Sequence, residues 1–416
     1  MKRKNLQNGL TPLIFLIIIA IVAVIIGGIY FSTKNKSSDN VLDRAKSSLG
    51  IYPACPKDLS GVLTYPLIDL KGVSAILPLG NISPPGHTSP ADHNYFGAVN
   101  NDKVAVYAPA DGWVTNITAI LEKDEKTGKY NDHGITIDIE VCQGLTLTFA
   151  NLTEASPLLK SGWPKNDNGC KYDIVKPGHT YTEGQCYFHS NLRVKAGDLL
   201  GYTGKEPTMP GSTGLAFEIW AANYNKAPDS DVDWSYYNDD RRAHIMCTFD
   251  LYSGDLKNQF YAKLGGIDQN TGKFAPRTIP PLCGQVNQDL VGTIQGMWFS
   301  EKPKDKNDSV EFRNGGLAFI HNNYDGITGE ISIGGDLNNG KGTIGFFSPI
   351  HSGLVNREPS EVKADGNIYC YNAGSGDFQG KLFLVQLIDS HHIKAEIQDG
   401  SCSGNYSFTK PFSYER

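Results

Sequence analysis

The sequence lacks an excess of positive charge. Its 416 residues include 38 Lys and Arg against 44 Asp and Glu, which gives a formal net charge of −6 and a pI of about 5.9. Proteins that bind nucleic acid normally present a basic patch or stripe, and none is visible along this chain. The charge balance therefore predicts no nucleic-acid partner, and it does not favour binding to an anionic surface either.

Charge of either sign is missing from a long stretch near the start of the chain. No charged residue occurs between Lys4 and Lys34, and most of this stretch is strongly apolar. A helix of such length spans the roughly 30 Å hydrocarbon core of a membrane. We therefore expect a transmembrane helix over residues 11–32. Residues 1–10 are expected on the cytoplasmic side because basic residues precede the helix, and the polar residues 33–54 predict a stalk.

Two alternatives to a retained anchor remain open. A cleaved signal peptide normally has a shorter apolar region that ends in a small-x-small site, whereas here Gly28 is followed by three bulky residues. A prepilin-like leader normally carries Glu five residues after its processed glycine, and this chain has Ile14 at that place. Both patterns favour an anchor that stays in the mature protein.

The chain also has no Cys-x-x-Cys pair, so a zinc ribbon or a redox motif has no support. Its eight cysteines all lie after the apolar stretch. An even number of cysteines in this position predicts an oxidising, extracytoplasmic compartment and up to four disulfides. Eight cysteines allow 105 pairings, and closeness in the sequence favours three disulfides, namely Cys170–Cys186, Cys247–Cys283 and Cys370–Cys402.

Long charged helical runs are missing as well, and short segments of alternating polarity take their place. Such segments, bounded by Gly, Pro, Asn and Asp, predict β-strands. One helix is expected near residues 254–264, where apolar residues recur at helical spacing. We therefore predict a mainly β protein. The strands expected in its first part are 104–107, 113–117, 134–139, 145–149, 199–202 and 215–220.

A proline-rich segment at residues 278–284 marks a boundary between two parts of the chain. We expect one β domain over residues 55–284 and a second, antiparallel β domain over residues 285–416, built as a small barrel or sandwich. Scattered histidines in this second part predict no metal site. Its expected strands are 292–299, 316–321, 329–334, 342–347, 382–387 and 392–397.

Three pieces of the first part carry a resemblance to a known family. They are VYAPADGWV at residues 106–114, VKAGDLLGYTG at residues 194–204 and TGLAFEI at residues 213–219. In order and spacing they resemble the lysostaphin-type (LytM- and LasA-like) zinc endopeptidases over roughly residues 75–222. The resemblance implies a peptidase-like β-sheet core of the duplicated hybrid motif, or barrel-sandwich, type. The first two pieces alone also resemble lipoyl-like barrels.

The residues that serve catalysis in that family are mostly replaced here. The family is similar to other zinc hydrolases, which use three protein ligands and leave one position open for water. Its His-x-His pair corresponds to Gly214 and Ala216, and its assisting histidine corresponds to Asn151. Only His87 and Asp92 remain from its His-x-x-x-Asp motif, with one residue too many between them. The resemblance therefore implies the fold without the catalytic residues.

The sequence consequently gives little support for a bound metal ion. Two ligands hold a divalent ion weakly and no positioned base remains, so we expect no cofactor and treat the two retained residues as a remnant. An active zinc endopeptidase stays an alternative if His93, His133 or His179 replaces the missing ligands. The acidic segment 231–242 lacks the glycine and spacing of an EF-hand loop, which favours a solvated loop over a calcium site.

Aromatic residues supply the candidate ligand-binding positions. Aromatic faces stack well on sugar rings, although a single tryptophan is more often part of a core. The candidates are Trp113, Trp163, Trp220 and Tyr224. With the location outside the membrane, they predict a catalytically degenerate domain that binds or scaffolds at the cell wall, through peptidoglycan, a partner hydrolase or another envelope protein. A lipoyl-like connector of an envelope assembly is the second alternative.

Overall fold

The computed structural model describes residues 52–416 apart from residues 85–86, 100–102, 125, 164–168, 175–181, 205–213, 230–231, 238, 268–272, 301–314, 373–374, 377 and 379. Cys55–Arg416 forms one compact unit. The expected transmembrane helix over residues 11–32 lies outside the described residues. Within the described part of the chain, no helix has the length and apolar character needed to cross a membrane.

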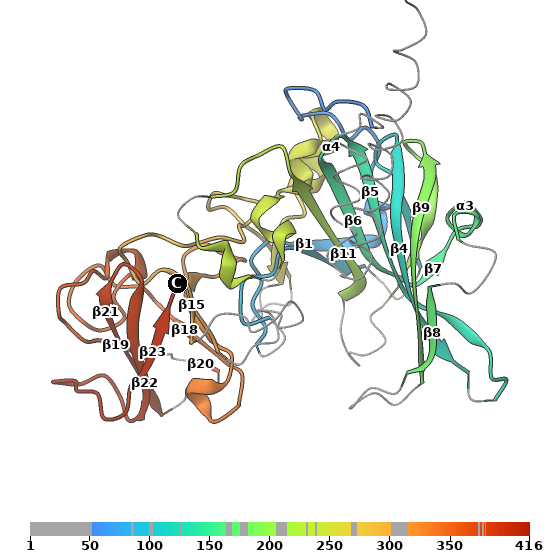
Figure 1. Cartoon of the computed structure of the whole chain (residues 1–416). Helices are drawn as coiled ribbons and strands as arrows, with labels where there is room; N and C mark the ends of the chain where they lie inside the picture. The colour runs from blue at the N-terminus through green and yellow to red at the C-terminus, as the bar shows by residue number, and fades with distance from the viewer. Residues whose placement is uncertain are drawn as a thin grey trace, which may run out of the picture. The chain divides into compact units, whose positions relative to one another are not determined.

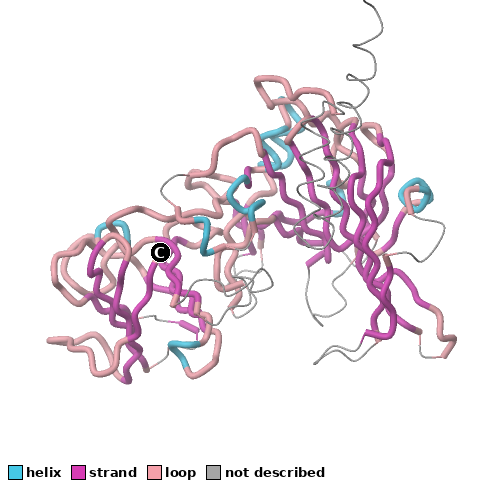
Figure 2. Tube along the Cα trace, in the orientation of Figure 1, coloured by secondary structure: helices cyan, strands magenta, loops and turns pink. Residues whose placement is uncertain are grey.

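Strands dominate the structure, as the alternating polarity predicts (Figure 2). The two described α-helices are short, with α3 at Pro157–Ser161 and α4 at Gly254–Tyr261. The second of these confirms the helix expected near residues 254–264, and it buries Phe260 against the first core. All pairs of neighbouring named strands are antiparallel. The expectation of a mainly β, antiparallel protein is therefore confirmed.

The first sheet has nine strands in the order β1-β2-β11-β6-β5-β4-β9-β8, with β12 beside β11 (Figure 1). A three-stranded sheet and a hairpin accompany it. The strands of the first sheet are β1 Val73–Leu77, β2 Asn94–Ala98, β4 Gly112–Lys123, β5 Tyr130–Cys142, β6 Leu145–Leu152, β8 Cys170–Ile174, β9 Glu183–Val194, β11 Gly214–Asn223 and β12 Ile245–Met246. The three-stranded sheet contains β3 Val104–Tyr107, β10 Leu199–Thr203 and β7 Glu154–Ala155, in that order. The hairpin consists of β13 Gly265–Ile267 and β14 Phe274–Pro276.

The alternation of side chains gives the first sheet a core face and a polar face. Ile135, Ile137 and Ile139 of β5 are fully buried in the first hydrophobic core. The residues between and after them, among them Asp138 and Glu140, point to the opposite side because successive strand residues alternate. The first sheet therefore has one apolar face and one face lined by polar side chains.

Two of the three pieces that carry the family resemblance lie side by side. Strand β3 pairs with β10, with Leu199 opposite Tyr107. The turn after β3 is fixed by Asp111, whose carboxylate accepts a 3.0 Å hydrogen bond from the Ala196 backbone N–H. Gly197 in the facing turn has a φ of 90°, a conformation that favours glycine. These turns align the start of β4 with the end of β9.

The second sheet also has nine strands, in the order β19-β21-β22-β23-β15-β16-β17-β18-β20 (Figure 1). Its two edge strands follow each other in the chain, and the sheet nearly closes into a barrel. A separate core that includes Trp298, Phe319 and Tyr371 fills it. Its strands are β15 Gly296–Phe299, β16 Gly316–His321, β17 Gly329–Ile333, β18 Thr343–Phe347, β19 Tyr369–Tyr371, β20 Ser375–Gly376, β21 Lys381–Asp389, β22 His392–Asp399 and β23 Phe412–Glu415.

All eight cysteines form disulfides. The pairs Cys170–Cys186, Cys247–Cys283 and Cys370–Cys402 confirm the pairing expected from closeness in the sequence. The fourth, Cys55–Cys142, joins residues 87 positions apart and ties the start of the compact unit to β5. Four disulfides are typical of an extracellular or otherwise oxidising compartment.

A third, small core joins the second sheet to two segments beside the first sheet. Tyr236 stacks on Phe299 of β15 with ring centroids 5.0 Å apart, and Ile82 belongs to the same core. The Arg277 guanidinium donates to the backbone carbonyls of Asn322 and Asn323 at 3.1 and 2.8 Å. The segments around Ile82 and Tyr236 are the ones that carry the site described next.

Candidate functional site

His87 and Asp92, the two residues that resemble a zinc-binding motif, lie in the loop between β1 and β2. The backbone of His87 forms two 2.9 Å hydrogen bonds with Ser83, and its Nε2 atom lies 2.9 Å from the Tyr95 hydroxyl. Asp92 lies at the end of this loop and is only 2% exposed. The loop therefore brings both residues to the place where β2 begins.

Asp92 is a buried carboxylate whose two oxygens have different partners. Its Oδ1 atom lies 2.8 Å from Nδ1 of His93, and its Oδ2 atom accepts a 3.3 Å hydrogen bond from the Arg241 guanidinium. Burial alone would raise the pKa of Asp92, but the His93 hydrogen bond and the charges of Arg241 and Arg242 outweigh burial. The pKa of Asp92 consequently lies well below its usual range, so the group is ionised at neutral pH.

A helical turn, η3 at Asp240–His244, holds Arg241 in place. Asp239 caps this turn by accepting a 3.0 Å hydrogen bond from the Arg241 backbone N–H, and its other oxygen accepts a 2.7 Å bond from the guanidinium. The guanidinium carbon lies 4.5 Å from the centroid of the Trp220 ring, a cation–π contact. Burial would lower the pKa of Arg241, but the carboxylates around it, Asp239 first, raise that pKa above its ordinary value. Arg241 is thus a fixed positive charge.

Aromatic rings surround His93 beside this ion pair. The centroid of the His93 ring lies 4.7 Å from that of Tyr95 and 5.3 Å from that of Trp220. Its Nε2 atom lies 3.6 Å from the Glu218 carboxylate. Below, the Asp92 cluster means the set of His87, Asp92, His93, Tyr95, Glu218, Trp220 and Arg241.

Strand register brings the positions compared with the peptidase motifs, Asn151, Gly214 and Ala216, to the same part of the sheet. Glu218 of β11 lies opposite Tyr95 of β2 on one side and opposite Ala150 of β6 on the other. Asn151 follows in β6 and has a φ of 60°. Gly214 and Ala216 lie at the start of β11, where the structure describes the backbone alone, and Gly214 pairs with Gly97 of β2. All of these positions occur on three neighbouring strands.

A row of hydrogen-bonded polar side chains crosses the sheet next to the Asp92 cluster. Thr148 donates to Asp138 at 2.6 Å, and the Asn116 amide donates to the other Asp138 oxygen at 3.1 Å. The Asn116 carbonyl oxygen lies 2.9 Å from Nδ1 of His189 and accepts a 3.2 Å bond from the Tyr187 hydroxyl. We call these five residues the polar ladder. It spans β6, β5, β4 and β9, and its β9 end is exposed.

The polar ladder continues the Asp92 cluster, since Thr148 lies directly opposite Trp220. Trp113 lies on the same face, opposite Glu140 in β5 and Arg193 in β9. The Arg193 guanidinium carbon lies 5.6 Å from the centroid of the Trp113 ring. The Asp92 cluster, the polar ladder, Trp113 and Glu140 together form what we call the polar face.

The four aromatic candidates are not all brought together. Trp113 and Trp220 belong to the polar face, and Tyr224, just after β11, lies 4.8 Å from His244 in ring-centroid distance. Trp163 packs instead against Phe188, a residue of the first core, with ring centroids 6.2 Å apart. Since Phe188 alternates with Tyr187 and His189 along β9, Trp163 lies on the core side of the sheet.

The residues of the Asp92 cluster do not fit a zinc ion. Both Asp92 oxygens already bond to His93 and Arg241, and the guanidinium charge would repel a metal cation at the same place. In the part of the chain that the structure describes, no group of three His, Cys, Asp or Glu residues is arranged to hold a metal.

The positions that could replace the missing ligands are spread over the chain. His93 bonds to Asp92, whereas His133 in β5 lies 3.3 Å from Glu122 of β4, in a different ion pair. His179 lies outside the described residues, as does Asp231 of the acidic segment. In that segment Asp233 and Asp239 cap helical turns through their side chains, which is a structural use of the acidic residues.

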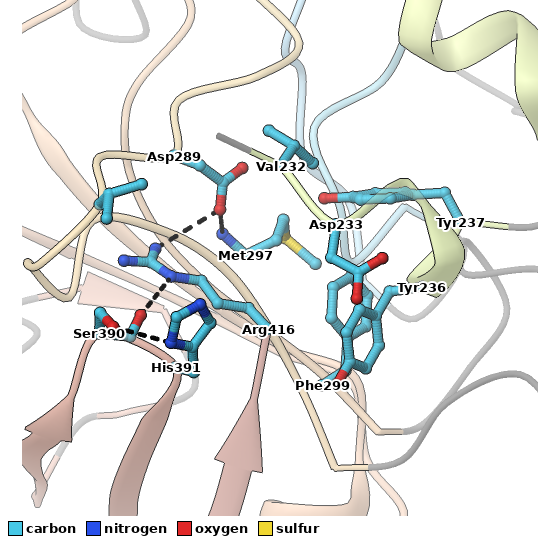
Figure 3. Close-up of a pocket in the computed structure, with 11 residues that line it drawn as sticks. Val232, Asp233, Tyr236, Tyr237, Asp289, Met297, Phe299, Ser390, His391 and Arg416 are labelled. Atoms are coloured by element: carbon cyan, nitrogen blue, oxygen red, sulfur yellow. Dashed lines mark hydrogen bonds and ion pairs between the residues drawn. The ribbon is translucent and has the colours of Figure 1, made fainter. Parts of the chain in front are cut away.

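A cavity of about 180 Å³ lies between the segment before η3 and the second sheet (Figure 3). Tyr236 and Tyr237 line one side, and Asp289 and Arg416 line the other. Asp289 accepts a 3.0 Å hydrogen bond from the Met297 backbone N–H and lies 3.5 Å from the Arg416 guanidinium (Figure 3). Burial raises the pKa of Asp289 to about 6, although the Arg416 charge opposes the rise.

Sequence reasoning missed most of the polar face. Asp138 and Glu140 alternate with isoleucines in β5, and this alternation of carboxylates within a strand was a usable signal. Arg241 offered no such signal, because it contacts Asp92 across 149 positions of sequence.

Comparison of the whole chain with protein-family models, curated proteins and solved structures gave no match.

Proposed function

We propose that this protein is a membrane-anchored, extracytoplasmic protein of the cell envelope whose first sheet binds the cell wall without cleaving it. The observation that carries the proposal is the Asp92–Arg241 ion pair, formed where the resembled peptidases would use an aspartate to hold zinc. A guanidinium cannot activate water as a bound metal does. The four disulfides agree with a location outside the cytoplasm.

The polar face supplies the chemistry for binding. Trp113 is half-buried, and Tyr187 is 37% exposed beside the half-buried Asp138 and the exposed His189. Sugar rings bind to proteins by stacking on aromatic faces while their hydroxyls pair with amides, imidazoles and carboxylates. The proposed ligand is therefore peptidoglycan, bound across β4, β5 and β9.

A sedimentation assay with purified peptidoglycan tests this proposal. The full-length chain, purified in mild detergent, should sediment with the wall material, and Trp113→Ala should weaken binding about tenfold because a stacking contact is lost. Phe412→Ala is the matched control, since Phe412 is a comparably exposed aromatic residue (39%) in the second sheet. It should bind like the parent chain.

Two results would contradict the proposal. Failure of the parent chain to sediment with peptidoglycan would reject wall binding and leave a connector role for the lipoyl-like alternative. Release of soluble wall peptides by the parent chain, but not by an Asp92→Asn variant, would show an active hydrolase.

A further inference from the structure

The Asp92 carboxylate requires a positive partner. Burying an isolated ionised carboxylate is so unfavourable that such groups either become neutral or acquire a cation and hydrogen bonds. Asp92 is 2% exposed and lies in a loop next to the buried, uncharged Thr88, Ser89 and Asn94. Its ionised state is therefore maintained by the groups that contact it.

We propose that Arg241 permanently supplies the positive charge that a zinc ion would provide beside Asp92, so that the Asp92 cluster is assembled without any metal ion. This inference rests on the proposed function, because the comparison with zinc comes from the same family resemblance. It assigns to Arg241 a positioning role: the residue holds the loop that carries His87, Asp92 and His93.

The geometry requires arginine and excludes lysine as an equivalent. One guanidinium nitrogen contacts both Asp92, at 3.3 Å, and Asp239, at 2.7 Å, while the flat group lies over Trp220. A planar, delocalised guanidinium can bond at its edge while its flat face lies on a ring, whereas a lysine ammonium, although it can lie over a ring, is a compact and strongly hydrated charge with no flat face. Arg241→Lys should therefore restore the charge without restoring the arrangement.

Contacts within the protein hold the Arg241 guanidinium in position, so no ligand is needed to place it. Asp239 caps the turn that carries Arg241, and the neighbouring Arg242 donates to the Pro90 carbonyl in the loop that carries Asp92. The Arg242 guanidinium carbon lies 5.3 Å from the Tyr237 ring, which packs on Phe299 of the second sheet. Arg241 and Arg242, which are consecutive residues of η3, thus both bond to the loop between β1 and β2.

The experiment compares metal removal with removal of the guanidinium in the full-length chain. Metal content is measured by elemental analysis, and the Tm is measured with and without a chelator. The variants are Arg241→Met, Arg241→Lys, Asp92→Asn and the double variant Arg241→Met/Asp92→Asn. Arg193→Met is the matched control, because Arg193 also stacks on a tryptophan of the polar face.

The parent chain should contain no stoichiometric metal and show no Tm shift with chelator. Arg241→Met should lower the Tm by about 5–10 °C, because it removes from the buried Asp92 carboxylate the guanidinium that contacts it. The double variant should recover at least half of that loss, and Arg241→Lys should fall between the parent and Arg241→Met. Arg193→Met should change the Tm much less.

Three results would overturn the inference. These are one metal ion per chain with a chelator-induced drop in Tm, a Tm loss in Arg241→Met no larger than in Arg193→Met, or losses from Arg241→Met and Asp92→Asn that simply add. If Arg241→Met does not fold, the parent chain with chelator and Arg241→Lys decide the question. Sedimentation with peptidoglycan tests only wall binding, whereas metal content and Tm test only the role of Arg241. A failure of one proposal can therefore be distinguished from a failure of the other.

Discussion

Two buried carboxylates, one beside each large sheet, show opposite ways of tolerating a titratable group away from water. Asp92, next to the first sheet, is 2% exposed and keeps its charge because His93, Arg241 and Arg242 surround it. Glu330, in β17 of the second sheet, is 3% exposed and bonds to the Asn322 amide. Burial raises the pKa of Glu330 to about 8, and the nearby Asp325 adds to the rise.

The contrast shows two treatments of a buried carboxyl group, one that keeps its charge and one that is largely neutral. A charge kept in a buried place needs dedicated partners, and those partners also position aromatic and polar neighbours of the polar face. A carboxyl group kept neutral at pH 7 needs only a hydrogen bond, and it serves the second sheet as packing. The comparison can be tested by removing each carboxylate in turn.

Asp92→Asn should have the largest effect, a loss of about 3–4 kcal/mol in the free energy of unfolding at pH 7, because it breaks a buried ion pair. The folded-state pKa of Asp92 lies below the unfolded value, so its stabilisation is present above about pH 4 and declines as the pH falls further. Chemical denaturation at pH 7, 5 and 3.5 measures the gap between variant and parent. Asp255→Asn, at an exposed position in α4, is the control. A gap that stays constant down to pH 3.5 would show that Asp92 acts by packing alone.

Glu330→Gln should act through the pH dependence of stability. The folded-state pKa of about 8 lies above the unfolded value, so the parent loses stability as the pH rises toward and through 8. We expect the parent to lose about 2–3 kcal/mol between pH 6 and 8.5 from this group, and the glutamine variant to lack that loss. Glu396→Gln is the matched control in β22. There hydrogen bonds from Thr409 and Lys410 outweigh burial and lower the pKa of the carboxylate, so the pH effect has the opposite sign.

Asp289→Asn should have the smallest effect. It adds an intermediate case to the comparison of Asp92 with Glu330, because Asp289 lines the cavity between the segment before η3 and the second sheet. Its folded-state pKa of about 6 is raised, so the parent should lose about 2 kcal/mol as the pH rises from 4 to 7. The variant should show a flatter profile by thermal unfolding over that range. An unchanged profile would mean that the Arg416 charge compensates Asp289 fully.

Much of the fold could be predicted from the sequence, because strand alternation and turn residues act locally. The expected strands at 104–107 and 316–321 coincide with β3 and β16, and three disulfides followed from closeness in the chain. The long strand β9, Glu183–Val194, was missed because three of its alternating buried positions are Gly184, Cys186 and Ser190, which are too small or too polar to show an apolar alternation in the sequence.

The candidate site could be predicted only where the sequence resembles a known motif. His87 and Asp92 were singled out through that resemblance, despite one residue too many between them, but the partner that determines the state of Asp92 could not be predicted. Arg241 occurs in a short turn with no periodic pattern, and its contact with Asp92 depends on how β11 lies beside β2. Trp163 was grouped with Trp113 and Trp220 because composition alone does not reveal on which face of the sheet a side chain lies.

The Cys55–Cys142 disulfide has a mechanical consequence. When the chain is pulled from its N-terminal side, tension reaches Cys55, passes through the sulfur bridge to Cys142 at the end of β5, and continues toward β6 without entering the intervening backbone. That shielded stretch contains β1, β2, β4 and the loop with His87 and Asp92. A protein tethered at one end and attached to a rigid network at the other would thus experience stretching forces, while this part of its site would be spared from covalent strain.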